Sequence, residues 1–192
     1  MIEGVAASNA IIEVWRSGKW EDYHTVKTLY PSSADADIAV FETNETAAQP
    51  FGITPTETQT TAGVTFGQQA WYIGYPYGMS SVLAKGSTIT ALPFMKRGSM
   101  SAVDASSPDT VVFYIDRFNN PGFSGGPVIY WEFATHAYKI LAVVQSYRTD
   151  RAKELINGQP VDTDILVNSG ILVSYSIRHA IDAIEKSLST TR

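Results

Sequence analysis

The sequence predicts an all-β fold, a sandwich or a barrel, that ends in one C-terminal helix. Short apolar segments recur along the chain with Pro, Gly and Ser between them, and only the tail has helical spacing. Hydrophobic residues make up 44% and charged residues 17% of the sequence, the balance of a protein that buries a real core. Since 192 residues lie within the usual size of one domain, we expect a single domain of two lobes.

The N-terminal part of the chain predicts a hairpin, a strand and a linker. Residues 11–29 alternate as two strands joined at Ser17-Gly18-Lys19, a Gly-containing turn suited to a hairpin. Residues 37–41 form a compact apolar strand that follows an acidic loop. Residues 44–62, rich in Thr, Pro and Ala, form a connection without periodicity.

The remaining strands are bounded by Pro, Gly and Ser. They are predicted at residues 69–75, 80–92, 99–103, 110–116, 126–130, 138–147 and 165–174. In the tail, residues 176–188 predict a helix with Ile177, Ile181, Ile184 and Leu188 on one stripe. We expect that stripe to dock on the barrel.

The charge and residue counts exclude several functions. The chain has 14 Lys and Arg against 19 Asp and Glu, a net charge of −5, and no basic run interleaved with aromatic residues, so no nucleic-acid partner is predicted. The absence of cysteine excludes disulfides, thiolate chemistry and Cys-ligated zinc. Three dispersed His residues offer no metal-ligand cluster, so we expect neither metal nor cofactor.

The sequence gives no indication of export or membrane insertion. Residues 1–4 lack a basic region followed by an apolar stretch, and no apolar run approaches the ~20 residues of a membrane span. We therefore expect a soluble chain, cytoplasmic by default, without a membrane partner.

The segment that carries chemistry is Asn120-Pro121-Gly122-Phe123-Ser124-Gly125-Gly126-Pro127. A tight turn between two apolar strands there presents the Ser124 hydroxyl outward. Gly122 can take backbone angles closed to other residues, so its N–H and that of Ser124 can converge on one point, an oxyanion hole. Gly125 and Gly126 keep Cβ atoms away from a substrate acyl group. A Gly-rich turn whose serine only satisfies local backbone is the structural alternative.

Residues 122–127 resemble the Gly-x-Ser-Gly-Gly-Pro motif of trypsin-like serine peptidases of the chymotrypsin fold (the PA clan), which contains the nucleophile. Asp37-Ile38-Ala39-Val40 is similar to the family segment with the triad aspartate, and residues 71–78 are similar to the Gly-x-Pro turn that opens the second barrel in bacterial members. The resemblance implies a double β-barrel. It divides the chain into a partial first barrel and linker at about 1–62, a second barrel at about 63–175 and a helix at 176–188.

Asp37 has two interpretations. A lone Asp before an apolar strand is commonly a turn cap. The resemblance implies instead that Asp37 accepts a hydrogen bond from an imidazole and holds it in the tautomer that deprotonates Ser124. On that interpretation the two side chains should lie within roughly 10 Å of each other.

The general-base histidine is the missing part of the pattern. His24 lies only 13 residues before Asp37, in a strand-like alternation, and is a weak candidate. His136 and His179 are expected to be ordinary surface residues. Because residues 11–29 resemble the hairpin that follows the family histidine, we expect a chain truncated before that histidine, with an incomplete first barrel whose unpaired edges invite pairing with another chain.

Two functions remain open, and both have a peptide or protein as partner. The first is a serine endopeptidase that acts through an acyl-enzyme on Ser124 and is inactive in this chain for lack of the base. The alternative is a non-catalytic pseudopeptidase whose strand at Val144, Gln145 and Ser146 pairs with an extended peptide. A purely structural β-protein would have no use for the glycines around Ser124.

The resemblance also implies a specificity pocket with Phe118 at its base and Tyr147 at its wall, which disfavours basic residues.

Overall fold

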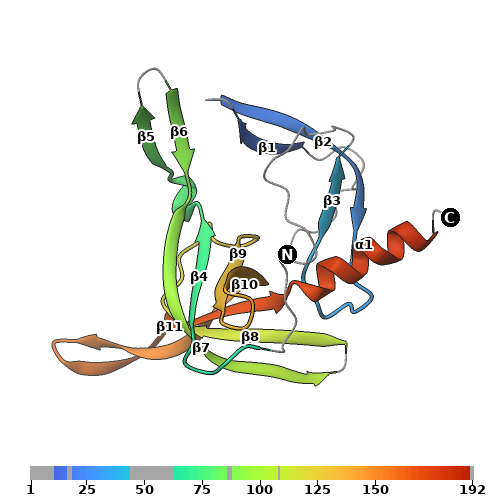
Figure 1. The fold of residues 1–192 in the computed structure, drawn as a ribbon. Helices are drawn as coiled ribbons and strands as arrows, with labels where there is room; N and C mark the ends of the chain where they lie inside the picture. The colour runs from blue at the N-terminus through green and yellow to red at the C-terminus, as the bar shows by residue number, and fades with distance from the viewer. Residues whose placement is uncertain (1–10, 17–18, 44–62, 86–87, 108, 191–192) are drawn as a thin grey trace.

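The computed structural model describes residues 11–16, 19–43, 63–85, 88–107 and 109–190. The predicted turn at residues 17–18 and the linker at residues 44–62 lie outside the described residues. The described chain contains a three-stranded sheet, a closed barrel, a separate hairpin and a C-terminal helix (Figure 1). The all-β prediction with one terminal helix is therefore confirmed.

The first sheet is antiparallel in the order β1-β2-β3. Its strands are β1 (Ile11–Arg16), β2 (Lys19–Leu29) and β3 (Val40–Thr43). The predicted hairpin over residues 11–29 is confirmed by pairs such as Ile11 with His24. The predicted strand at residues 37–41 starts later, since β3 begins at Val40 and Asp37 lies in the preceding irregular segment.

Six strands close a barrel in the order β10-β11-β8-β7-β4-β9. They are β4 (Gln69–Gly74), β7 (Phe94–Ser107), β8 (Thr110–Asp116), β9 (Pro127–Glu132), β10 (Ala137–Ile156) and β11 (Gln159–Ser176). Alternate residues point inward, so Tyr72, Phe113 and Val128 are fully buried in one core. This core supports the loop that holds Ser124.

Two hairpins project from the barrel (Figure 1). The strand predicted at residues 80–92 is a hairpin of β5 (Ser81–Lys85) and β6 (Thr88–Leu92). The far ends of β10 and β11 form a second arm, which closes through Asn157 and Gly158 with φ angles of 51° and 78°. Two positive φ angles at an Asn-Gly pair are the geometry of a type I′ hairpin turn, a signal that could have extended the predicted strands.

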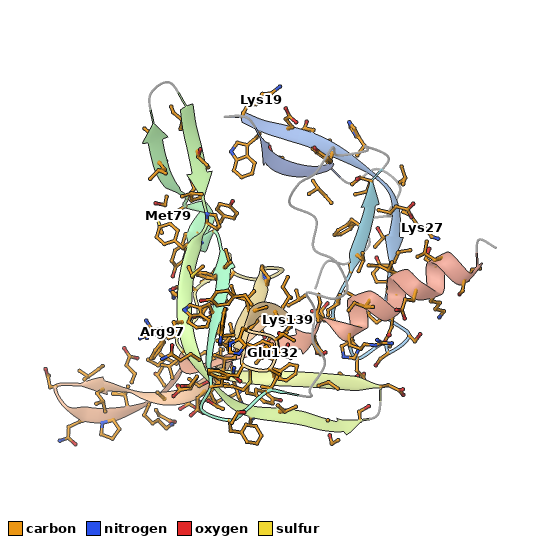
Figure 2. All side chains as sticks on the ribbon, viewed as in Figure 1. Lys19, Lys27, Met79, Arg97, Glu132 and Lys139 are labelled. Atoms are coloured by element: carbon orange, nitrogen blue, oxygen red, sulfur yellow. The ribbon has the colours of Figure 1, made fainter. Side chains whose placement is uncertain are left out.

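Helix α1 (Arg178–Thr190) packs on the first sheet, where Lys27 Nζ donates to Ser187 Oγ at 2.7 Å (Figure 2). Its buried residues are His179, Ala180 and Ala183, whereas Ile184 and Leu188 are 40% and 64% exposed. The predicted apolar stripe is therefore correct only in its first half, since Ile177 and Ile181 are half-buried, and the small side chains allow the helix to approach closely. No helix in the described part of the chain has the length and apolarity to cross a membrane.

Candidate active site

Ser124 is exposed in the loop that connects β8 to β9. The two residues after it are joined to β10 by backbone hydrogen bonds. Gly125 N donates to Val144 O at 2.8 Å, and Val144 N donates to Gly126 O at 2.9 Å. The serine is thus fixed by an extension of the barrel sheet, with its hydroxyl directed away from the core.

The residues before Ser124 are bonded to a short 3-10 turn, η2 (Pro76–Gly78), and to Tyr75 before it. Tyr77 N donates to Pro121 O, and Tyr75 N donates to Gly122 O, both at 2.9 Å. These bonds fix both carbonyl groups. Among the described residues, no backbone or side-chain acceptor receives the N–H of Gly122 or of Ser124. Two free amides in the loop of the nucleophile are the donors that a developing oxyanion requires.

The glycines around Ser124 are required for different reasons. Gly122 has a φ of 98°, and a Cβ there would overlap the carbonyl oxygen of Tyr75. A Cβ on Gly126 would overlap the carbonyl oxygen of Ile73. Gly125 has a φ of 83° but open space around it. The expectation that Gly126 keeps room for a substrate is therefore corrected, because it allows β4 to approach the loop.

Phe123 anchors the loop from below. Its side chain is fully buried and meets the ring of Tyr72 edge-to-face at 5.1 Å between centroids. The Tyr72 hydroxyl donates to Phe118 O at 2.9 Å. Burial raises the pKa of Tyr72 to about 12, although the positive charge of Arg117 opposes the shift.

Lys96 also lies beneath the loop. Its Nζ donates to Phe118 O at 3.1 Å and to the side-chain oxygen of Asn120, and it sits 5.2 Å from the centre of the Phe123 ring. Burial lowers the pKa of Lys96, and repulsion from Arg117 lowers it further. This cation fixes two carbonyl groups in the segment that leads to Ser124.

Asp37 and Ser124 contact opposite ends of one residue, Gln145. Ser124 Oγ donates to the backbone carbonyl of Gln145 at 2.9 Å, and Gln145 Nε2 donates to Asp37 Oδ2 at 3.4 Å. The first sheet and the barrel thereby meet at this half-buried side chain. The structure thus brings the two predicted triad members to one place and puts an amide between them.

Gln145 lies at an irregularity of β10, where the register with β11 shifts between Val144 and Ser146. Such a bulge turns a carbonyl out of the ladder, which is why this one can reach Ser124. The Ser146 hydroxyl donates to Gln145 Oε1, which orients the amide so that its nitrogen faces Asp37. Sequence reasoning named Gln145 as a peptide-binding residue and missed its contacts with Ser124 and Asp37, because no local pattern reveals a bulge.

Tyr175 on β11 is a neighbour of Asp37 that sequence reasoning missed. Burial raises the pKa of Tyr175, the negative charge of Asp37 raises it further, and a hydrogen bond from the backbone of Asp37 lowers it. Asp37 therefore faces an amide and a phenol. No local pattern in the sequence indicated this contact.

None of the three histidines contacts Ser124 within the described part of the chain. His24 is exposed on β2, as expected, and His136 is exposed in the turn between β9 and β10. His179 is only 8% exposed, and its Nε2 accepts a hydrogen bond from Val111 N at 3.1 Å. The surface position predicted for His179 is wrong, since it joins α1 to β8.

The predicted substrate-binding residues differ in their exposure. Phe118 is 63% exposed, and its ring lies 3.7 Å from where a Cβ on Gly170 would be. Tyr147 is half-buried on β10. Val144 is 1% exposed and uses its N–H and carbonyl on the Ser124 loop. Val144 is therefore a core residue and offers no free backbone edge to a peptide, which corrects its predicted role.

The closed barrel, the glycine-flanked serine and the neighbouring carboxylate define a β-barrel protein of the trypsin-like fold. The family model of the trypsin-like peptidase domain matches residues 4–132, about two thirds of the chain. The chain therefore belongs to the trypsin-like peptidase family. The match includes Asp37 and Ser124. Comparison with curated proteins gave no match.

Proposed function

We propose that this domain is a serine endopeptidase in which Ser124 is the nucleophile and Asp37 is the carboxylate that orients the base. The single observation that carries the proposal is the pair of free amides at Gly122 and Ser124 beside an exposed serine hydroxyl. A loop with a structural role alone does not need two backbone N–H groups without acceptors.

The proposed reaction is acyl transfer. The Ser124 oxygen attacks the carbonyl carbon of a peptide bond, and its proton passes to an imidazole. The tetrahedral oxyanion is held by the amides of Gly122 and Ser124. The C–N bond then breaks, the imidazole gives its proton to the leaving amine, and water hydrolyses the ester to release the acid.

The imidazole is not supplied by the described histidines, so we expect negligible turnover from this chain alone. A hydroxyl bonded to the carbonyl of Gln145 has no partner that can take its proton. We therefore propose that Ser124 and Asp37 are in position for catalysis but remain inactive without a base.

A second candidate, a non-catalytic peptide-binding pseudopeptidase, is favoured by the bridge at Gln145. Its amide uses the Asp37 oxygen that an imidazole would need. In this case the surface around Ser124 and Asp37 would bind a peptide without cleaving it.

A fluorophosphonate probe with and without millimolar imidazole tests the two candidates. For the peptidase, imidazole acts as the external base, so we expect Ser124 to be labelled when it is present and the Ser124→Ala variant to remain unlabelled. No labelling of the folded chain under either condition would favour the pseudopeptidase. Rapid labelling without imidazole would show that the chain has a base of its own.

A further inference from the structure

A concave site lies on the outer face of the barrel. It is a cavity of about 470 Å³, within the usual range for ligand sites. Its walls are mostly aromatic and come from three strands, with Trp71 on β4, Trp131 on β9 and Tyr138 on β10. The other lining residues are Thr65, Gln68, Gln69 and Phe133.

The cavity is separate from the Ser124 loop. Trp131 lies near the far end of β9, whose first residue, Pro127, follows the Ser124 loop. At about 3.3 Å per residue, Pro127 and Trp131 are roughly 13 Å apart along the strand. A ligand in the cavity can therefore bind without contacting Ser124.

The aromatic walls are fixed before any ligand arrives. The Tyr138 ring meets Trp131 at 5.0 Å and Trp71 at 5.8 Å between centroids, both edge-to-face. Gln68 holds the neighbouring loop, because its Nε2 donates to Trp131 O at 2.6 Å and its Oε1 accepts from Thr65 N at 3.2 Å. Preorganised rings lower the entropy cost of binding.

The charged groups near the cavity disfavour a cationic ligand. The side chains that line it carry no carboxylate. The neighbouring Glu132 is only 6% exposed and accepts from the hydroxyls of Tyr130 and Thr135. Arg97 is exposed on β7 in register with Trp71, and it projects from the side of the barrel turned away from the first sheet (Figure 2). Aromatic faces attract cations, but the positive charge of Arg97 beside Trp71 opposes this attraction, so a neutral ligand fits the site best.

The polar groups argue against a sugar. An oligosaccharide presents hydroxyls that need acceptors as well as donors, whereas both amide ends of Gln68 already bond within the protein and Arg97 offers donors only. A proline-rich segment presents apolar rings and backbone carbonyls only, and it is already extended as a polyproline II helix. Aromatic grooves recognise such segments, and exposed Arg97 and Gln69 offer donors for the carbonyls.

We propose that the outer face of the barrel is a binding site for a proline-rich protein segment in the polyproline II conformation. The site stands independently of catalysis at Ser124. It would hold a protein partner or substrate on the domain while the Ser124 loop remains free.

Titration of the 192-residue chain with a blocked ten-residue proline peptide tests the proposal through the intrinsic tryptophan fluorescence, since Trp71 and Trp131 line the site. We expect a saturable change with the proline peptide and none with a Gly-Ser peptide of equal length. Tyr138→Ser should weaken binding at least about tenfold, because interface aromatics carry much of the affinity. Tyr138 is 57% exposed, so the variant should fold.

The matched control is Tyr30→Ser, a substitution at a 62% exposed tyrosine of the first lobe, which should bind the proline peptide like the parent chain. Saturable binding of a chito- or cello-oligosaccharide without binding of the proline peptide would overturn the proposal. It would equally be overturned by equal affinity in the parent and the Tyr138→Ser variant, or by no saturable change with any of these ligands.

Discussion

The hydroxyl of Ser124 donates to the backbone carbonyl of Gln145 at 2.9 Å. A carbonyl oxygen cannot take the proton, so the bond orients the nucleophile without activating it. The same residue occupies Asp37 through its side-chain amide at 3.4 Å. Gln145 therefore contacts both groups that the proposed chemistry needs. It lies between Ser124 and Asp37, where the chemistry needs a base.

Removal of the Gln145 side chain should expose Asp37 to imidazole from solution. In Gln145→Ala the backbone carbonyl stays, but the Asp37 oxygen becomes free to accept an imidazole N–H. We expect labelling of Ser124 by a fluorophosphonate in millimolar imidazole to be about tenfold faster than in the parent. This gain is smaller than the effect of a positioned base, because imidazole from solution is not held in place. Intact-mass spectrometry over time measures the rate.

The control for this comparison is the labelling rate without imidazole, which should be equally slow in both proteins. Adding Asp37→Ala to Gln145→Ala should remove the gain. If parent and Gln145→Ala respond equally to imidazole, the amide does not block Asp37.

Two neighbouring glycines provide a matched pair for the geometry of the loop. Both have positive φ angles, but only at Gly122 would a Cβ overlap a backbone oxygen, that of Tyr75. We expect Gly122→Ala to lower the free energy of unfolding by about 3 kcal/mol, from left-handed strain and overpacking, and Gly125→Ala by about 1 kcal/mol, from strain alone. Urea denaturation measures both, and equal losses would contradict the close approach of Tyr75.

The raised pKa of Tyr72 predicts a loss of stability at alkaline pH. Its ordinary pKa is 10.0, and in the folded protein it is about 12. Between these values the unfolded chain releases the phenol proton and the folded chain keeps it, so the contribution is complete below pH ~10 and is lost as the pH rises toward 12. The loss should reach about 2 kcal/mol, near the upper limit for a shift of this size.

The Tyr72→Phe variant is the control, measured by urea denaturation from pH 7 to 11.5. It should be about 1 kcal/mol less stable at neutral pH, since it loses the hydrogen bond to Phe118 O. Its stability should then fall less steeply above pH 10. The lowered pKa of Lys96 has the opposite effect on the pH dependence of stability, because folding favours the deprotonated form of Lys96. Lys96 is present in both proteins, so its effect cancels in the comparison.

The sequence predicted those parts of the molecule whose signals are local. Strand β8 has the predicted bounds, Thr110–Asp116, because apolar residues run between clear turn residues. The loop at Ser124 was identifiable because three glycines surround one serine. The long arm of β10 and β11 was underestimated, because its middle is polar and exposed, although Asn157-Gly158 marked its turn.

Contacts between distant segments could not be predicted. The bridge at Gln145 joins residues 108 positions apart and depends on a bulge that leaves no sequence pattern. The burial of His179 follows from its bond to Val111 N and from close packing of the helix at Ala180 and Ala183. An apolar stripe was a poor guide there, because small residues, and not the largest ones, faced the sheet.

The last prediction concerns charge at the proposed specificity pocket. Phe118 is 63% exposed beside Gly170, so its side chain can be replaced without opening the core. A phenyl ring gives a cation only a weak cation–π contact, whereas a carboxylate there would form a charged hydrogen bond with it. We expect Phe118→Asp to bind benzamidine, a planar cation, at least about tenfold more tightly than the parent, equivalent to ~1.4 kcal/mol. Phe118→Asn is the matched control for polarity without charge and should resemble the parent in isothermal titration. Equal affinity of the Asp and Asn variants, or tight binding by the parent, would show that Phe118 does not lie at the base of the pocket.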